Sequence, residues 1–268
     1  MPTSFEPAQT IDDVIQQLED IIQWSLEHQS RLGYFPVLYQ SVTKAVKTGI
    51  AENRFSDGAR MEKLDVIFAN RYLEAFHQYQ SRKKPSKVWA VAFDSARKSY
   101  LPVLNHLLLG INAHINLDLG IAAAETIAGP NVEPLKGDFD EINRLLFEMI
   151  NGVQDKLGEL SPLARWSDWF FRNWDERLAK FSLKKARENA WRVAQEFAQV
   201  PKSDQNAYIQ QEDQRMLVFA MLLKGVGFHS RIFYKLVQLF EKKRHPADII
   251  GVLRDVTREK GKWIFLAH

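Results

Sequence analysis

The sequence contains no cysteine in its 268 residues. This absence excludes disulfide bonds, thiol nucleophiles and metal sites ligated by cysteine. The sequence also lacks the G-x-S-x-G, G-x-x-x-x-G-K-S/T and G-x-G-x-x-G motifs and any EF-hand loop. These motifs mark serine hydrolases, phosphate-binding loops, dinucleotide-binding folds and calcium sites. Sites of those types are therefore excluded.

A strong excess of one charge is absent too. Lys and Arg number 36, Asp and Glu number 33, and the formal net charge is +3. The basic residues gather only at 82–87, 184–187 and 242–244, and no aromatic side chains interleave with them. We interpret these short runs as solvent-exposed helix faces, and we expect no nucleic-acid partner.

Long hydrophobic runs and a secretion signal are also missing. No window approaches the roughly 18 apolar residues that a membrane-spanning helix needs. The first residues, 1–17, are acidic and lack the basic and apolar regions of a signal peptide. We expect a cytoplasmic protein without a transmembrane segment.

The apolar pattern follows the helical period, and no alternating strand-like segment of useful length occurs. Apolar residues make up 46% of the chain, which is enough for a sizeable core. The predicted fold is all-α, a single-domain bundle (1–268) of about ten helices around one buried central helix at about 100–127. The irregular connection 129–137 is the one candidate for an internal boundary. Helices are predicted at 10–31, 36–53, 59–80, 87–98, 100–127 and 138–158.

The predicted central helix is apolar nearly all round, as expected of a helix enclosed by its neighbours. Small residues, including Gly110 and Gly120, would let adjacent helices approach closely. At about 100° per residue, the polar side chains form two stripes on roughly opposite faces. One stripe holds Asn105, Asn112 and Asn116, and the other holds His114, Asp118 and Glu125.

The helix at 59–80 places Arg71 inside an apolar stripe formed by Leu64, Phe68 and Ala75. A buried guanidinium without a partner costs several kcal/mol. We therefore predict that Arg71 is buried and paired with Asp118, Asp65 or Asp138.

Aromatic residues are frequent in the second half, notably Trp166, Trp169, Phe170, Phe171 and Trp174. Aromatic side chains at helical spacing commonly form core packing. They are also typical of a deep apolar pocket for a lipid-like ligand, and the sequence leaves both interpretations open.

Four sequence blocks carry a family resemblance. They are RMEKLDVIFANRYLEAF (60–76), HLLLGINAHINLDLGIAAA (106–124), GDFDEIN (137–143) and ARENAW (186–191). Over about residues 33–199 the chain resembles a bacterial family of all-helical proteins of unknown function, with G-x-N-A-H-I-N-x-D-L as its most specific motif. The resemblance implies no activity or cofactor. The positions that it marks are Arg60, Asp65, Arg71, His106, Asn112, His114, Asn116, Asp118, Asp138 and Asn143.

The chemical hypothesis is a metal-assisted hydrolase of an ester or phosphoester. His114 and Asp118, four residues apart, present an imidazole and a carboxylate to one point. The metal-ligand candidates that would complete a site for a divalent ion such as zinc are His106, Asp65 and Asp138. A bound metal would activate water. The candidate catalytic residues are Asp118, Arg71, Asn112 and Asn116.

Two other interpretations stay open. In one, the protein binds an apolar small molecule or lipid-like ligand without catalysis, and Arg71 and the asparagines contact its polar end. In the other, the polar cluster is purely structural, and its members satisfy one another and nearby backbone groups.

Overall fold

The computed structural model describes residues 5–142, 144, 183–224 and 245–261. Every regular element in these ranges is a helix, so the all-α prediction is confirmed. The helices are α1 (Ile11–Glu27), η1 (Arg31–Gly33), α2 (Tyr34–Ala51), α3 (Gly58–Gln80), α4 (Lys87–Ala96), α5 (Val103–Ile111), η2 (Asn112–Asp118), α6 (Leu119–Ile127), η3 (Glu133–Leu135), α9 (Leu183–Phe197), α10 (Gln205–Lys224) and α12 (Pro246–Gly261). Residues 136–142 are helical as well.

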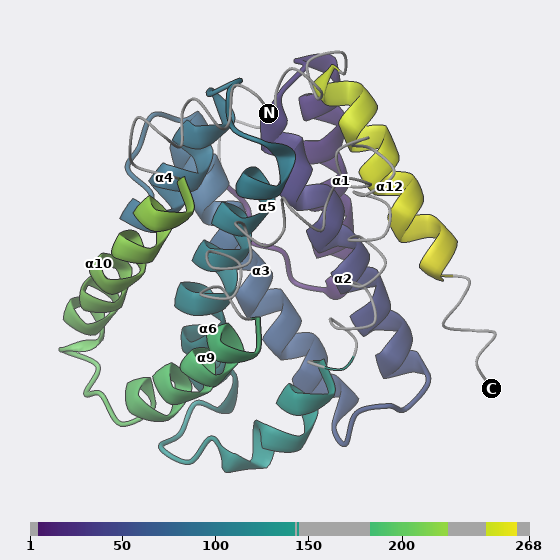
Figure 1. Ribbon diagram of the computed structural model, residues 1–268. Coiled ribbons are helices and arrows are strands. Elements are labelled where there is room, and N and C mark those ends of the chain that lie inside the picture. Colours follow the sequence, from purple (N-terminus) through teal and green to yellow (C-terminus); the bar gives the residue numbers. More distant parts are fainter. Residues whose placement is uncertain (1–4, 143, 145–182, 225–244, 262–268) are drawn as a thin grey trace, which may run out of the picture.

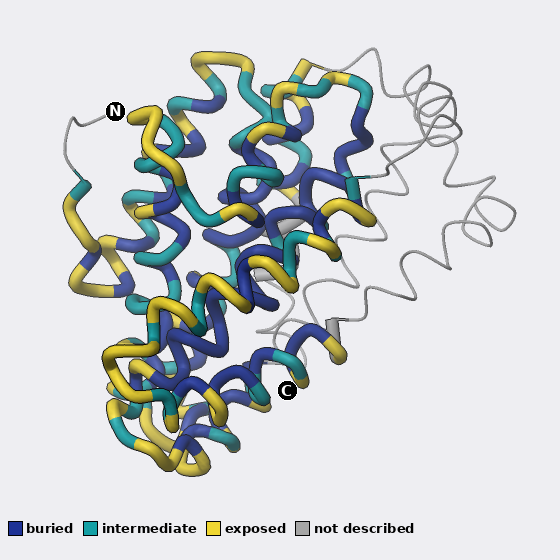
Figure 2. Tube along the Cα trace, turned by 90° about the vertical axis from the view of Figure 1, so that its left-hand side faces the viewer, coloured by how far each residue is buried: buried dark blue, intermediate teal, exposed yellow. Residues whose placement is uncertain are grey.

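The predicted central helix is present and enclosed. It consists of α5, η2 and α6 in succession, Val103–Ile127, and every residue from 112 to 124 is buried. Figure 2 shows that buried residues gather inside the molecule while exposed residues follow its outer faces. By length and composition this helix would be able to cross a membrane, contrary to our expectation that no segment is apolar enough. However, 89% of its most apolar window is buried inside the protein, which is typical of a core helix.

Helices from both halves of the chain surround the central helix (Figure 1). α2, α3 and α4 contact it, as do α9 and α10, and α10 also packs against α4. α12 returns to the beginning of the chain and packs along α2 and α1 (Figure 1). There Ile250 joins a second apolar cluster with Tyr34 and Leu107, and Arg254 forms an ion pair with Glu19 at 2.6 Å.

The middle of the central helix departs from the α-helical period. Residues 112–118 form a π-helix, and the amide of Leu119 donates to the carbonyl oxygen of His114, five residues earlier. The two polar stripes nevertheless face different neighbours, as predicted. Such π-helical turns within α-helices occur frequently at functional sites.

Local signals explain several helix ends. Thr10 and Asp13 form a reciprocal capping box at α1, and the Asp57 side chain accepts from the Arg60 amide at the start of α3. α1 ends at Glu27, earlier than predicted, and Gln29 then adopts a left-handed backbone with φ of 49°. A distant residue caps α4. Asp213 of α10 accepts hydrogen bonds from the amides of Lys87 and Val88 at 2.8 and 2.9 Å.

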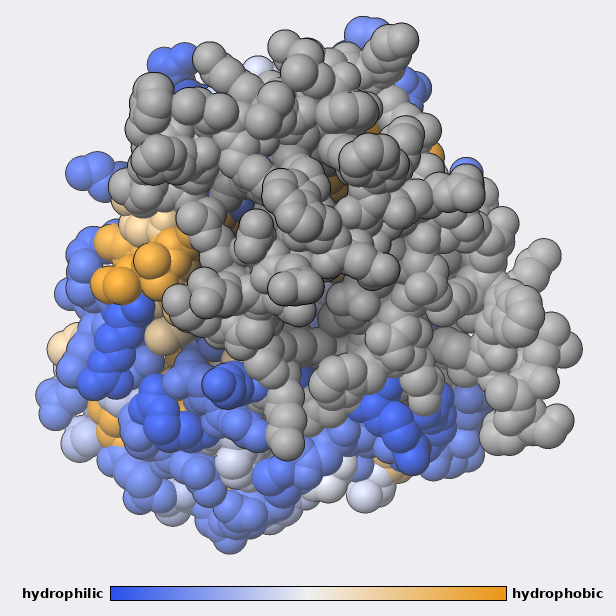
Figure 3. All heavy atoms as spheres, in the orientation of Figure 1, coloured by the Kyte–Doolittle hydropathy of each residue, from blue (hydrophilic) through white to orange (hydrophobic). Residues whose placement is uncertain are grey.

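The surface of α10 carries apolar side chains. Val218 and Leu222 are 62% and 60% exposed, while Ala220 and Leu223 of the same helix are buried. Among the atoms that carry a hydropathy colour in Figure 3, an apolar patch lies on the α10 side and most of the rest is polar. The aromatic residues Trp166 to Trp174 lie outside the described residues, so their assignment to core or pocket stays a prediction.

Close helix packing at Gly120 yields a stability prediction. A Cβ atom at this position would lie 2.4 Å from the Ala190 carbonyl oxygen of α9 and 2.7 Å from Val193. Because a backbone oxygen cannot swing aside, Gly120→Ala is expected to lower the free energy of unfolding by about 3 kcal/mol. Chemical denaturation measures this loss. Gly251→Ala in α12 is the matched control, since nothing lies within 4 Å of its Cβ position. That control is expected to be neutral or stabilising, and equal effects of the two substitutions would contradict the close approach of α6 and α9.

Candidate functional site

The carboxylate of Asp118, at the end of η2, joins three helices. Its Oδ1 accepts a hydrogen bond from Arg71 Nε of α3 at 3.1 Å. Its Oδ2 accepts one from the indole Nε1 of Trp89 of α4 at 2.8 Å. The predicted pairing of Arg71 with an aspartate is therefore confirmed. The predicted burial holds for Asp118 but only partly for Arg71, whose side chain is 21% exposed and also lies 3.9 Å from Glu125.

His114 lies in a cage of aromatic rings. Its imidazole stacks on Phe68 with a centroid distance of 3.5 Å and meets Tyr39 edge-on at 4.3 Å. Nδ1 is 3.7 Å from Asp118 Oδ2, which is too long for a hydrogen bond, and neither ring nitrogen has another partner among the described residues. Burial lowers the pKa of His114 below its ordinary value, so the ring is neutral near pH 7.

Asp65 adds a second buried polar group on the same side. It is only 6% exposed, and its Oδ2 has no hydrogen-bond partner in the described part of the chain. Burial, with a smaller contribution from Glu62, raises the pKa of Asp65 to about 8. The carboxyl group is therefore largely protonated at neutral pH and is able to donate a hydrogen bond to a ligand. The hydroxyl of Tyr39 is likewise buried, beside the Thr43 side chain, and forms no hydrogen bond of normal geometry with the described residues.

These groups line a pocket of about 70 Å³. Its walls come from α2, α3, the central helix and α9, and most of the lining side chains are apolar, such as Val46, Leu64 and Ile115. The polar contributors are Tyr39, Asp65, His114 and Arg187.

Arg187 is a pocket residue that our sequence analysis misassigned. We interpreted the basic run 184–187 as a solvent-exposed face, but the Arg187 side chain is only 2% exposed. Its Nη2 donates to the Phe139 carbonyl oxygen at 2.6 Å, and the guanidinium lies over the Phe139 ring at 4.3 Å from its centroid. The pattern of charges does not distinguish Arg187 from the lysines beside it. Its position in the block ARENAW (186–191) was the only feature of the sequence that marked it.

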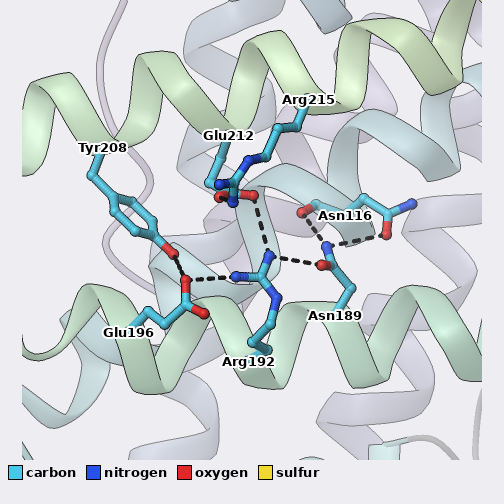
Figure 4. Close-up of polar contacts among 7 residues, drawn as sticks. All are labelled: Asn116, Asn189, Arg192, Glu196, Tyr208, Glu212 and Arg215. Carbon is cyan, nitrogen blue, oxygen red and sulfur yellow. Dashed lines mark hydrogen bonds and ion pairs between the residues drawn. The ribbon is translucent and has the colours of Figure 1, made fainter.

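Asn112 and Asn116 face the other side of the central helix. Asn112 donates to the Met216 carbonyl oxygen of α10 and accepts from Asn116. Asn189 of α9 contacts Asn116 and accepts a hydrogen bond from Arg192 (Figure 4). The asparagine stripe thus holds α9 and α10 against the central helix and does not line the pocket.

The network in Figure 4 continues from Arg192 to the protein surface. Arg192 pairs with Glu196, which accepts a hydrogen bond from Tyr208. Arg192 and Arg215 also pair with Glu212, whose side chain is fully buried. Two arginines thus compensate the buried carboxylate of Glu212.

The remaining metal-ligand candidates are dispersed. His106 packs edge-on against Tyr34, and burial lowers its pKa to about 3. Asp138 forms an ion pair with Arg60 at 2.7 Å and accepts from the Ser56 amide. Within ranges 5–142, 183–224 and 245–261, no group of three or more metal-ligating side chains occurs. The described structure therefore does not bring the five candidates His114, Asp118, His106, Asp65 and Asp138 together as one ligand set. Arg71 and Arg60 already neutralise two of the carboxylates. Asn143 lies outside the described residues.

The fold and the site define a helical domain with a buried, mainly apolar pocket beside an enclosed central helix. The chain belongs to a family of unknown function, DUF5995, whose model matches residues 11–225. Comparison with curated proteins and with solved structures gives no match.

Proposed function

We propose that this protein binds a small, largely apolar molecule in the pocket between α2, α3, η2 and α9. The observation that carries the proposal is the combination of an apolar lining with buried polar atoms that lack partners among the described residues. These atoms are Asp65 Oδ2, the Tyr39 hydroxyl and both ring nitrogens of His114. Buried polar groups are nearly always hydrogen-bonded, and each unmatched one costs about 1–3 kcal/mol. A ligand with one hydrogen-bonding group would recover part of that cost.

The pocket size limits the ligand. Its volume of about 70 Å³ is below the ~150 Å³ of an apolar cavity that admits benzene. A slender molecule, or the end of an alkyl chain, matches this space better than a fused ring system. The π-helix that carries His114 supports a functional role for this part of the central helix.

The metal-assisted hydrolase hypothesis gains less support. Asp118 already bonds to Arg71 and Trp89, and His106 and Asp138 lie among other partners. Nothing in the described ranges supplies a third ligand beside His114 and Asp118. We therefore propose ligand binding and assign no catalytic step.

Binding of straight-chain alcohols, from butanol to decanol, tests the proposal. At a concentration 100 times its Kd, a bound alcohol stabilises the fold by about 2.7 kcal/mol, which should raise the melting temperature by roughly 5 °C or more. We expect an optimum chain length, because the pocket volume is only about 70 Å³. Thermal unfolding and titration calorimetry measure the two quantities.

A pocket-filling variant provides the control. Val42→Phe adds a ring at a half-buried pocket position and is expected to abolish the alcohol effect. Val66→Phe places the same ring at a half-buried position of α3 that does not line the pocket, and it should keep the effect. If no alcohol stabilises the wild-type protein, or if Val42→Phe responds like wild type, the proposal is wrong.

A further inference from the structure

The inference concerns the charge of the ligand and rests on the proposed function. Arg187 is the feature that the apolar pocket leaves unexplained. Its guanidinium is almost completely buried, its Nε has no hydrogen-bond partner, and no described residue forms an ion pair with it. Among the described residues, its hydrogen bond goes to a neutral carbonyl oxygen, that of Phe139.

Other arginines of this protein show the contrast. Arg60, Arg71 and Arg54 are 20%, 21% and 22% exposed, and each pairs with a carboxylate at 2.7–3.1 Å. Arg254 is 29% exposed and pairs with Glu19. Arg187, at 2%, is far more buried than these four and lacks the carboxylate that they have. A buried guanidinium needs a partner more than an exposed one, since water cannot compensate its charge.

The pocket itself supplies no counter-charge. Burial lowers the pKa of Arg187 to about 9, with Asp140 acting in the opposite direction, so the group is still a cation at neutral pH. Asp65, the carboxyl group that lines the same pocket, has a pKa of about 8 and is mostly neutral there. His114 is neutral as well. Arg187 is therefore the one charged group near pH 7 among the described residues that line the pocket.

We propose that the natural ligand is a slender monocarboxylate, with its carboxylate bound to Arg187 and its apolar chain in the pocket. Arginine binds planar carboxylates through two parallel N–H donors, and the partnerless Nε together with a terminal nitrogen supplies such a pair. Phe139 holds the plane of the guanidinium by stacking against it. A single negative charge balances the pocket, whereas a phosphate monoester brings up to two and needs more space.

The test compares ligands that share a six-carbon chain but differ in their end group. Hexanoate, 1-hexanol, hexanamide and hexylamine are titrated into the wild-type protein at constant pH and salt, and calorimetry gives each Kd. We expect hexanoate to bind at least about tenfold more tightly than hexanol or hexanamide, since hydrogen bonds between ionised groups are roughly twice as strong as neutral ones. Hexylamine is expected to bind most weakly.

Substitution of Arg187 localises the effect. Arg187→Gln should remove the preference for hexanoate and leave hexanol binding within about threefold, because only the charged donor is lost. Arg187→Lys should keep part of the preference, since the charge stays while the planar fork is lost. Arg192→Gln removes an arginine from the same helix, in the network of Figure 4 and outside the pocket, and should keep the full preference.

The outcomes separate the two proposals. If hexanol binds as tightly as hexanoate, or if hexylamine binds best, the carboxylate inference is overturned while the pocket proposal survives. A hexanoate preference that persists in Arg187→Gln also overturns the inference, because another cation would then be responsible. If none of the four compounds binds, the pocket proposal itself fails. If Arg187→Gln does not fold, the comparison of the four ligands on the wild-type protein decides whether the inference holds.

Discussion

Replacement of Asp118 with alanine should lower the free energy of unfolding by about 3–4 kcal/mol. The substitution removes the acceptor for the buried indole N–H of Trp89 and leaves Arg71 without its carboxylate. Arg71 is 21% exposed, so water recovers part of its solvation and keeps the loss below that of a fully buried ion pair. Urea denaturation followed by circular dichroism measures the change.

Three further variants apportion this effect. Asp118→Asn keeps the shape and one acceptor oxygen, so a loss of about 1–3 kcal/mol is expected. Arg71→Met leaves the Asp118 carboxylate without its cation. The double variant Arg71→Met/Asp118→Ala should lose less free energy of unfolding than the sum of the two single variants, because neighbouring residues in one network are coupled. Trp89→Phe removes the indole donor alone. A loss below about 1 kcal/mol for Asp118→Ala would show that Arg71 and Trp89 find solvent instead, and would remove the argument for a structural carboxylate.

Replacement of Asp65 with asparagine should stabilise the protein, and increasingly so as pH rises. In the folded protein the pKa of Asp65 is about 8, whereas its ordinary value is 3.8. Between these values the folded state retains a proton that the unfolded state has released. The unfolded state thus binds fewer protons, and the contribution of Asp65 to the free energy of unfolding falls as pH rises from about 4 to 8.

Asparagine has no proton to lose, so the difference between Asp65→Asn and wild type isolates this effect. We expect the free energies of unfolding of the two proteins to differ by less than about 1 kcal/mol at pH 4. At pH 8 the variant should be more stable by roughly 3 kcal/mol or more. Titrating groups that do not interact with Asp65 are common to both proteins and cancel in the difference. If the difference in free energy of unfolding stays constant from pH 4 to pH 8, Asp65 ionises normally, which would contradict its burial without a partner among the described residues.

The sequence predicted those features that depend on periodicity and local chemistry. The enclosed central helix follows from apolar residues on all its faces, and the start of α1 follows from Thr10, a favourable N-cap residue. The pairing of Arg71 with an aspartate was inferable, with Asp118 as one of three candidates, because a charge inside an apolar stripe has few acceptable partners.

Features that depend on tertiary distances were not predictable. Spacing put His114 and Asp118 on one face, but it contains no information on whether His106 or Asp138 lies near them. The burial of Arg187 is likewise invisible in a basic run, because Lys184 and Lys185 beside it give the same local pattern. The π-helix was not predicted, because a period of 3.6 residues per turn was applied to the whole segment. An apolar pocket was predicted with Arg71 and the asparagines at its polar end, whereas the pocket beside the central helix contains Arg187 instead.

The capping of α4 by Asp213 has a consequence for the order in which the protein folds on the ribosome. Lys87 and Val88 emerge more than a hundred residues before the carboxylate that receives their amides, with a sequence separation of 126 for Lys87. The central helix emerges before α9 and α10, the two helices that cover its asparagine side. A nascent chain that ends near residue 182 thus lacks α9 and α10, which in the folded protein contact the 25 largely apolar residues Val103–Ile127. Exposed apolar surface of this kind favours aggregation and chaperone binding, and contacts of such long range slow the folding step that buries it.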